Sequence, residues 1–125
     1  MLYRFLKLLV GLGIRFYYKE VRVKNKVNLK TEGPLIIIAN HPNTLMDAMM
    51  LGHVCQQPIH YMAKATLFDS KFKMWLLRSL NMIPINRIGE GRIKGVSNQD
   101  SFLACYEMLE KGKTLVVFPE GTSFQ

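Results

Sequence analysis

Acidic residues are scarce at one end of this chain. Residues 1–30 contain eight lysines and arginines but a single acid, Glu20, whereas the remaining 95 residues contain nine bases and eight acids. The formal net charge of +8 is therefore an N-terminal property. A basic segment is attracted to nucleic acid, anionic lipid or acidic substrates, and here the bases are interleaved with leucine and aromatic side chains. That interleaving favours lipid.

Long apolar runs and cysteine clusters are also missing. The apolar stretch from Leu8 to Ile14 is far shorter than the ~20 residues that a membrane-spanning helix needs. No small-residue cleavage site follows it, which argues against a secretory signal. The only two cysteines, Cys55 and Cys105, match no metal-ligand spacing. We expect reduced core cysteines, no metal site and, because no recognised nucleic-acid motif is present, no nucleic-acid partner.

The N-terminal segment predicts a helix over residues 2–18. Its basic residues recur at steps of three or four and so line one stripe of that helix, while the rest of its surface is apolar. The stripe consists of Arg4, Lys7, Arg15 and Lys19, with Gly11 between them. We expect residues 1–19 to form an amphipathic helix in the headgroup plane of a membrane. A helix packed on the rest of the domain is the alternative, because amphipathicity alone does not separate the two.

Beyond the helix, short apolar segments alternate with helical ones. Strands are expected over residues 20–30 (with a turn near Asn25), 35–39, 58–63, 82–86 and 114–118, and helices over 44–55, 67–80 and 99–111. The run Leu35 to Ala39 is typical of a strand buried on both faces. The alternation predicts an α/β domain whose βαβ-type mixed sheet is flanked by helices and preceded by the N-terminal amphipathic helix.

Polar residues follow three of these strands directly. They are Asn40-His41, Asn86-Arg87 and Pro119-Glu120. In α/β sheets the chemistry collects outside the carboxyl ends of the strands, so we expect the three segments to share one edge.

The spacing of His41 and Asp47 sets a geometric condition. On a regular helix six residues would rotate the two side chains about 240° apart, so they meet only if His41 lies in the non-helical entry. Pro42 and the cap-competent Asn43 and Thr44 are suited to that entry. An aspartate bonded to one ring nitrogen leaves the other as a general base. The alternative is a capping histidine, with Asp47 merely complementing the helix dipole.

Three sequence blocks carry a family resemblance. They are Asn40 to Asp47, Ile83 to Arg87, and the Phe-Pro-Glu-Gly-Thr-Ser segment from Phe118 to Ser123. In order and approximate spacing they resemble the first three blocks of the phospholipid and glycerol acyltransferase family, which includes 1-acylglycerol-3-phosphate and glycerol-3-phosphate acyltransferases. Two departures stand out. Five residues instead of the commoner four separate the histidine from the aspartate, and the sequence stops after the third block, so we expect the C-terminal part of the family fold to be absent.

The resemblance implies an enzyme of phospholipid biosynthesis. It would transfer an acyl group from acyl-CoA or acyl carrier protein to a hydroxyl of a phosphorylated glycerol acceptor, without a cofactor, at the cytoplasmic face of a membrane. Residues 20–125 would be its catalytic domain. The alternative is a catalytically incomplete fragment that only binds membranes.

The resemblance also implies roles for particular residues. His41 would be the general base, Asp47 would orient and polarise it, and Arg87 would hold the acceptor phosphate. Glu120, with Gly121 and Thr122 shaping the turn, would help to bind the glycerol portion of the acceptor or order that cationic site. Arg87 as a solvated strand-end charge and Glu120 as a turn residue are the simpler alternatives. Lys64, which follows a predicted strand, is interpreted as a surface lysine, and a lysine that faces the phosphate is the alternative.

Overall fold

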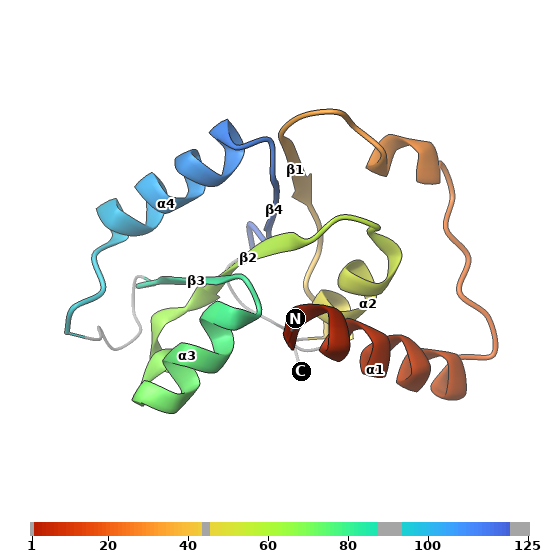
Figure 1. Ribbon diagram of the computed structural model, residues 1–125, viewed down its shortest axis with the longest axis horizontal. Coiled ribbons are helices and arrows are strands. Elements are labelled where there is room, and N and C mark those ends of the chain that lie inside the picture. Colours follow the sequence, from red (N-terminus) through yellow and green to blue (C-terminus); the bar gives the residue numbers. More distant parts are fainter. Residues whose placement is uncertain (1, 44–45, 88–93, 121–125) are drawn as a thin grey trace.

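Four short apolar strands pair into one parallel sheet (Figure 1). The computed structural model describes residues 2–43, 46–87 and 94–120. Within them the strands are β1 (Leu35–Ile38), β2 (Ile59–Lys64), β3 (Met82–Ile85) and β4 (Thr114–Val117), in the order β1-β4-β2-β3. Every pairing of these strands is parallel, so the predicted α/β class is confirmed with a described sheet that is parallel rather than mixed.

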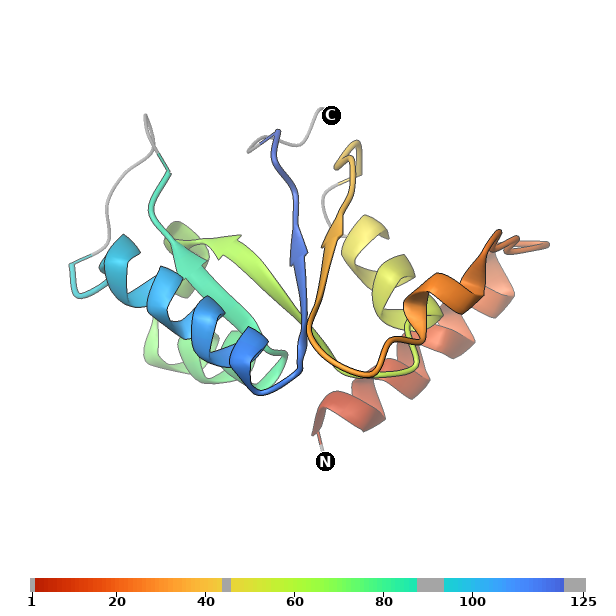
Figure 2. The same cartoon turned by 90° about the horizontal axis from the view of Figure 1, so that it is seen from above.

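Helices cover both faces of the sheet. They are α1 (Leu2–Tyr17), α2 (Met46–Val54), α3 (Lys71–Ser79) and α4 (Asn98–Glu110), with short 3-10 segments η1 (Lys26–Leu29) and η2 (Ala65–Phe68). Figure 1 shows α4 above the sheet and α1 with α3 below it. The carboxyl ends of β1, β4 and β3 all point toward the top of Figure 2. The expected common edge is therefore present.

A buried apolar cluster lies on each face, because alternate residues of β4 point to opposite sides. Val116 joins Cys55, Ile59 and Tyr61 on the α2 side. Leu115 joins Ile83 and Cys105 on the α4 side. Both cysteines are buried and unpaired, as expected.

The prediction that β1 is buried on both faces is wrong. Ile37 packs on the cluster beneath α2, but the exposed fractions of Ile36 and Ile38 are 52% and 71%. The cluster on the α4 side draws its residues from β2, β3, β4 and α4, and β1 contributes none. A continuous apolar run indicated burial on both faces, whereas the observed burial alternates along the strand.

The strand predicted over residues 20–30 is also wrong. Val21, Val23 and Val27 are exposed and the segment pairs with no described strand; η1 forms instead. The turn near Asn25 is confirmed, since its φ of 52° is left-handed.

The helix expected over 67–80 divides into η2 and α3, because Ser70 begins α3 as its N-cap and accepts a 3.3 Å hydrogen bond from the Lys73 amide. The other predicted elements agree within about two residues, apart from positions 44 and 45, which lie outside the described residues.

Helix α1 packs through one side and exposes apolar residues on the opposite side. Ile14 is buried, the Ile59 amide donates to the Tyr3 hydroxyl at 3.4 Å, and the Lys7 ammonium donates to the carbonyls of Cys55 and Gln56 beyond the end of α2. Five large apolar side chains point outward, with exposed fractions from 46% to 91%: Phe5, Leu8, Leu9, Leu12 and Phe16. At 100° per residue their mean direction lies about 180° from the packed side. No helix in the described part of the chain is both long and apolar enough to cross a bilayer.

Candidate active site

The edge of the sheet at which the carboxyl ends of the strands lie is called the carboxyl edge below. His41 reaches it because the backbone hydrogen bonds between β1 and β4 continue past the last residue of β1. Ile38 pairs with Val117, and the Ala39 amide donates to the Val117 carbonyl at 3.3 Å. This pairing brings the His41 ring onto Phe118, with ring centroids 4.1 Å apart and planes 21° from parallel. The side chain of His41 is only 11% exposed. Its ring is therefore held between two segments that are far apart in the sequence.

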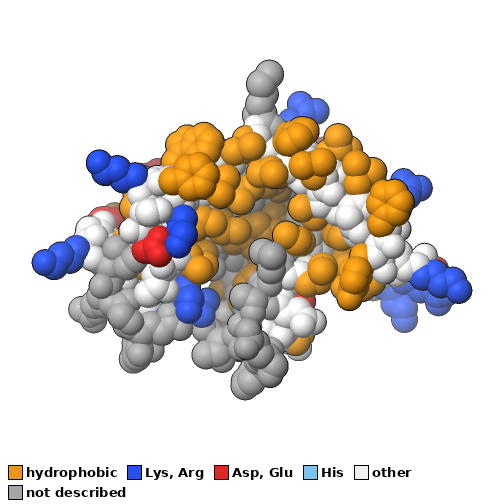
Figure 3. Space-filling view, turned by 90° about the horizontal axis from the view of Figure 1, so that it is seen from below, with side chains coloured by type: hydrophobic (Ala, Val, Ile, Leu, Met, Phe, Trp, Pro, Cys, Tyr) orange, Lys and Arg blue, Asp and Glu red, His pale blue; other side chains and the backbone are white. Residues whose placement is uncertain are grey.

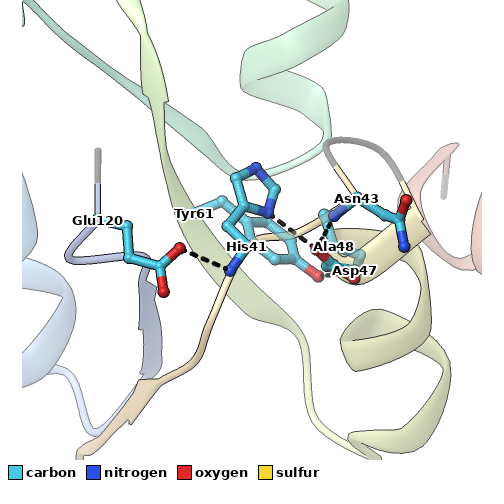
Figure 4. Close-up of polar contacts among 6 residues, drawn as sticks. All are labelled: His41, Asn43, Asp47, Ala48, Tyr61 and Glu120. Carbon is cyan, nitrogen blue, oxygen red and sulfur yellow. Dashed lines mark hydrogen bonds and ion pairs between the residues drawn. The ribbon is translucent and has the colours of Figure 1, made fainter. Parts of the chain in front are cut away.

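Glu120 contacts the same histidine from the end of β4. Its Oε2 accepts from the His41 backbone amide at 3.5 Å, a contact between residues 79 positions apart (Figure 4). Glu120 itself is exposed. The contact fixes the backbone of His41 and leaves its ring free of that carboxylate.

Asp47 is positioned by the first turn of α2. The Asp47 amide donates to the Asn43 carbonyl at 3.1 Å, and the Asn43 amide donates to Asp47 Oδ2 at 2.8 Å. This reciprocal pair resembles a capping box and turns the carboxylate back toward the helix entry. The condition set by the sequence is met, because His41 lies outside the helix, in its entry.

The histidine and the aspartate face each other. His41 Nδ1 lies 3.3 Å from Asp47 Oδ2, and the aspartate side chain is 21% exposed. Nδ1 is buried and makes no hydrogen bond to a described residue. Its distance from Asp47 Oδ2 is short enough for a hydrogen bond, but the direction in which the two atoms meet is not suitable. Figure 4 shows the other ring nitrogen pointing away from Asp47, as a base that acts on a bound group requires.

Tyr61 anchors the helix that carries the aspartate. Its buried hydroxyl donates to the Ala48 carbonyl at 2.6 Å and thereby ties α2 to β2. Burial raises the pKa of Tyr61 above its ordinary value, so the hydroxyl stays a donor. Sequence reasoning missed both this tyrosine and the stacking role of Phe118. The signal for Phe118 was its place beside the Pro-Glu-Gly-Thr residues; a lone tyrosine in a strand gave no comparable signal.

Arg87 lies at the same edge but not beside His41. It follows β3, and β4 and β2 separate β3 from β1, so at about 4.8 Å per strand the two strand ends are roughly 14 Å apart. Arg87 is half-buried. Lys64, the last residue of β2, pairs with Ile85 and so lies between the two ends.

A local hydrogen-bond network fixes the backbone next to Arg87. The Asn86 amide donates to Asn98 Oδ1 at 2.7 Å, and Asn98 Nδ2 donates back to the Asn86 carbonyl at 2.8 Å. The Asn86 side chain also donates to the Val96 carbonyl at 2.6 Å. The start of α4 therefore holds the end of β3.

The structure brings together His41, Asp47 and Glu120, and it holds Arg87 apart at the same edge. Gly121 and Thr122 lie outside the described residues.

Comparisons with known proteins agree with the sequence blocks. A family model described as Acyltransferase matches residues 20–125. The chain is 30% identical over 103 residues to the "1-acyl-sn-glycerol-3-phosphate acyltransferase" of Bacillus subtilis (strain 168). The aligned region covers 82% of this chain and 48% of the relative. It is 25% identical over 117 residues to the "1-acyl-sn-glycerol-3-phosphate acyltransferase LPAT1, chloroplastic" of Arabidopsis thaliana. This aligned region covers 93% of the chain and 31% of the relative. The chain thus spans half or less of the length of these relatives. No solved structure matches it significantly.

Proposed function

This chain belongs to the acyltransferase family, and we propose that it transfers an acyl group from a thioester to the free hydroxyl of 1-acylglycerol-3-phosphate. The acceptor is inferred from the names of the two relatives. Acyl-CoA and acyl carrier protein are both suitable donors, because the reacting group is the same thioester. Residues 20–125 contain the proposed catalytic domain, with residues 1–19 as its membrane contact.

The proposed reaction needs one base and no covalent enzyme intermediate. The ring nitrogen of His41 that points away from Asp47 accepts the proton of the acceptor hydroxyl. The hydroxyl oxygen then attacks the thioester carbonyl, the new C–O ester bond forms, and the C–S bond breaks. The proton passes from His41 to the departing thiolate. Asp47 orients the ring and stabilises its positive charge while it carries the proton.

The single observation that carries this proposal is the 3.3 Å approach of His41 Nδ1 to Asp47 Oδ2. A capping histidine would have no need of a carboxylate that is itself fixed by a reciprocal hydrogen-bond pair. Burial strengthens the argument, because a charge interaction is worth more where little water reaches it. Phe118 and Glu120 hold the ring and the backbone of His41 in place.

The acceptor phosphate is proposed to bind near the β2 and β3 ends of the edge. Arg87 offers a planar guanidinium suited to a phosphate, and Lys64 supplies a second cation nearer to His41. Glu120, together with Gly121 and Thr122, is proposed to shape the site for the glycerol portion. The acceptor would then lie along the carboxyl edge, with its hydroxyl at the β1 end.

An apolar cavity supports a lipid substrate. A space of about 190 Å³ lies between α1, α2 and the start of β3, and its lining is almost entirely apolar. Tyr3, Leu6 and Val10 of α1 face Met49 of α2 and Met82 of β3 across it. Thioether side chains adapt to chains of variable shape, so we propose that an acyl chain occupies this space.

An acyl-transfer assay tests the reaction. The chain is incubated with labelled acyl-CoA or acyl carrier protein and a panel of 1-acylglycerol-3-phosphate, glycerol-3-phosphate and an uncharged monoacylglycerol. We expect labelled product with the first acceptor and a His41→Ala rate lower by ~10²–10⁴-fold, because a neutral hydroxyl needs a base. No product from a folded chain would support the alternative of an incomplete, membrane-binding fragment. Full activity of His41→Ala would refute the proposed base.

Membrane contact through α1 is the second part of the proposal, and we place it at the cytoplasmic face. The helix uses one side to pack on α2 and still exposes Phe5, Leu8, Leu9, Leu12 and Phe16 on the other. Figure 3 looks onto the side where α1 and α3 lie and shows apolar side chains gathered around a hollow, with lysines and arginines at the rim. An exposed apolar face bordered by bases suits a helix in the headgroup plane.

Substitution tests this contact better than deletion, because removal of α1 would also remove the hydrogen bonds that Tyr3 and Lys7 make to the backbone before β2 and at its start. Leu9→Gln with Phe16→Gln should release most of the protein from vesicles in a flotation assay. The matched control is Phe102→Gln with Leu103→Gln, since these exposed α4 residues lie on the other face of the sheet. Equal flotation of the two double variants would contradict contact through α1.

A further inference from the structure

A basic groove runs along one edge of α1, and the proposed chemistry does not use it. Its volume is about 600 Å³, and it lies between α1, the segment that follows α1, and His53 at the end of α2. Its cationic lining comes from Arg4, Lys7, Arg15 and Lys19. Gly11 forms part of the wall, where an added Cβ would lie 3.0 Å from the His53 ring. The absence of a side chain at Gly11 therefore leaves room for the imidazole against the helix.

Three of the four cations have no counter-charge in the part of the chain that the structure describes. Lys7 already donates to the carbonyls of Cys55 and Gln56, where it complements the C-terminal end of α2. The only acid in the lining, Glu20, is held by Arg22 at 2.8 Å. Arg4, Arg15 and Lys19 thus face the groove with a net positive charge and no described acidic partner.

The rest of the lining decides which anion fits. Leu8 and Leu12 line the groove and are also members of the exposed apolar face, with exposed fractions of 62% and 47%. A ligand in the groove would therefore present an anionic group to the bases and apolar chains to the adjoining leucines. Guanidinium groups suit phosphate oxygens, because their planar forks can donate two parallel hydrogen bonds.

We infer that this groove binds the phosphate headgroup of an anionic phospholipid at the membrane surface. The inference rests on the proposed membrane contact of α1, which would hold the basic edge at the level of the headgroups. The groove is separate from the active site, because His53 lies six residues beyond Asp47 on α2, or roughly 9 Å along the helix axis. The bound phospholipid is therefore an anchor and not the acceptor at His41.

Vesicle partitioning of matched variants tests the groove. Arg4→Gln with Arg15→Gln removes two groove charges, and Lys24→Gln with Lys26→Gln removes two charges from exposed residues that do not line it. The probes are vesicles of phosphatidylcholine alone and of phosphatidylcholine with phosphatidate. On the phosphatidate vesicles we expect the groove variant to bind roughly thirtyfold more weakly than the wild type, and the control variant to lose less than about threefold.

The outcomes separate the groove from the membrane contact. Equal losses for the two variants would show general attraction of a basic segment and would overturn the groove. Binding of the wild type to vesicles of phosphatidylcholine alone measures the contribution of the apolar face, so no binding there would count against membrane contact through α1. The difference in binding between the two variants on phosphatidate vesicles tests the groove independently of that result.

An NMR titration with a short-chain, soluble phospholipid distinguishes binding of a lipid from binding of free phosphate. Dihexanoyl phosphatidate should shift the backbone amide resonances of Gly11 and His53 in the wild type and not in the groove variant. Inorganic phosphate at the same concentration should cause much smaller shifts, because it lacks the chains that contact Leu8 and Leu12. Identical saturating shifts with inorganic phosphate would overturn the assignment to a phospholipid.

Discussion

The two ends of the carboxyl edge are built in different ways. At the β1–β4 end, His41 is held by Phe118, Glu120 and Asp47, so that segments up to 79 residues apart meet at one residue. At the β3 end, Arg87 is supported through Asn86 and Asn98, which are only 12 residues apart. The first end depends on the assembly of the whole sheet. The second depends on a local strand-to-helix connection.

This difference fits the separate tasks that are proposed for the two ends. A base must be oriented closely with respect to the atom it serves, and contacts from several elements provide that orientation. A phosphate site needs charge and reach more than a fixed angle. Because roughly 14 Å separates the strand ends, the proposed acceptor would have to join them, and each end could be altered while the other remains intact.

The largest expected effect comes from the β1 end. Asp47→Asn keeps the shape of the side chain and an oxygen that can accept from the Asn43 amide, but it removes the charge that is proposed to stabilise protonated His41. We expect kcat to fall by ~10²–10⁴-fold with little change in KM for the acceptor. Steady-state kinetics measure both constants. Asp69→Asn is the control, because Asp69 is an exposed carboxylate that pairs only with Lys73 at 2.9 Å.

At the β3 end the loss should appear in binding. Arg87→Ala is expected to raise KM for the acceptor roughly tenfold to hundredfold, the usual value of a hydrogen bond to a charged group, with KM for the acyl donor unchanged. Arg87→Lys should recover part of that loss, since it keeps the charge but not the fork. Arg78→Ala, which removes an exposed arginine of α3, is the matched control. An equal rise in KM for both substrates would indicate a folding defect instead.

The smallest expected effect comes from a substitution that changes the β3 end alone. Asn98→Ala removes two hydrogen bonds to the Asn86 backbone and so loosens the support of Arg87. We expect KM for the acceptor to rise roughly threefold to tenfold with kcat maintained. Gln99→Ala, at the exposed neighbouring position of α4, should leave both constants unchanged. A fall in kcat for Asn98→Ala would mean that the two ends are coupled through the sheet.

The sequence predicted the elements well where burial determines them. The runs at Leu35, Ile59, Met82 and Thr114 are strands because apolar stretches of this length pair in a sheet. It failed over residues 20–30, where the alternating valines have no described strand to pair with, and at Ile36 and Ile38, where none of the described helices covers the strand. Local patterns report what a segment prefers; they do not report which neighbours it meets.

The candidate site could be predicted in the same partial way. The entry geometry of His41 and Asp47 followed from a six-residue spacing on a helix, and the structure confirms it. The common edge of the three blocks followed from the alternation of strands and helices, which predicted an α/β sheet. The separation between His41 and Arg87 did not follow, because it depends on β4 inserting between β1 and β2, and strand order is set by packing along the whole chain.

The double variant Asp47→Asn with Arg87→Ala tests most directly whether the two ends act separately. The quantity to measure is kcat/KM for the acceptor in the wild type, both single variants and the double variant, at a saturating concentration of acyl donor. Sites more than about 7–10 Å apart that share no partner have additive free-energy effects. The double variant is therefore expected to lose the product of the two single losses. A double variant no worse than Asp47→Asn alone would contradict it and would show that His41 and Arg87 work as one unit.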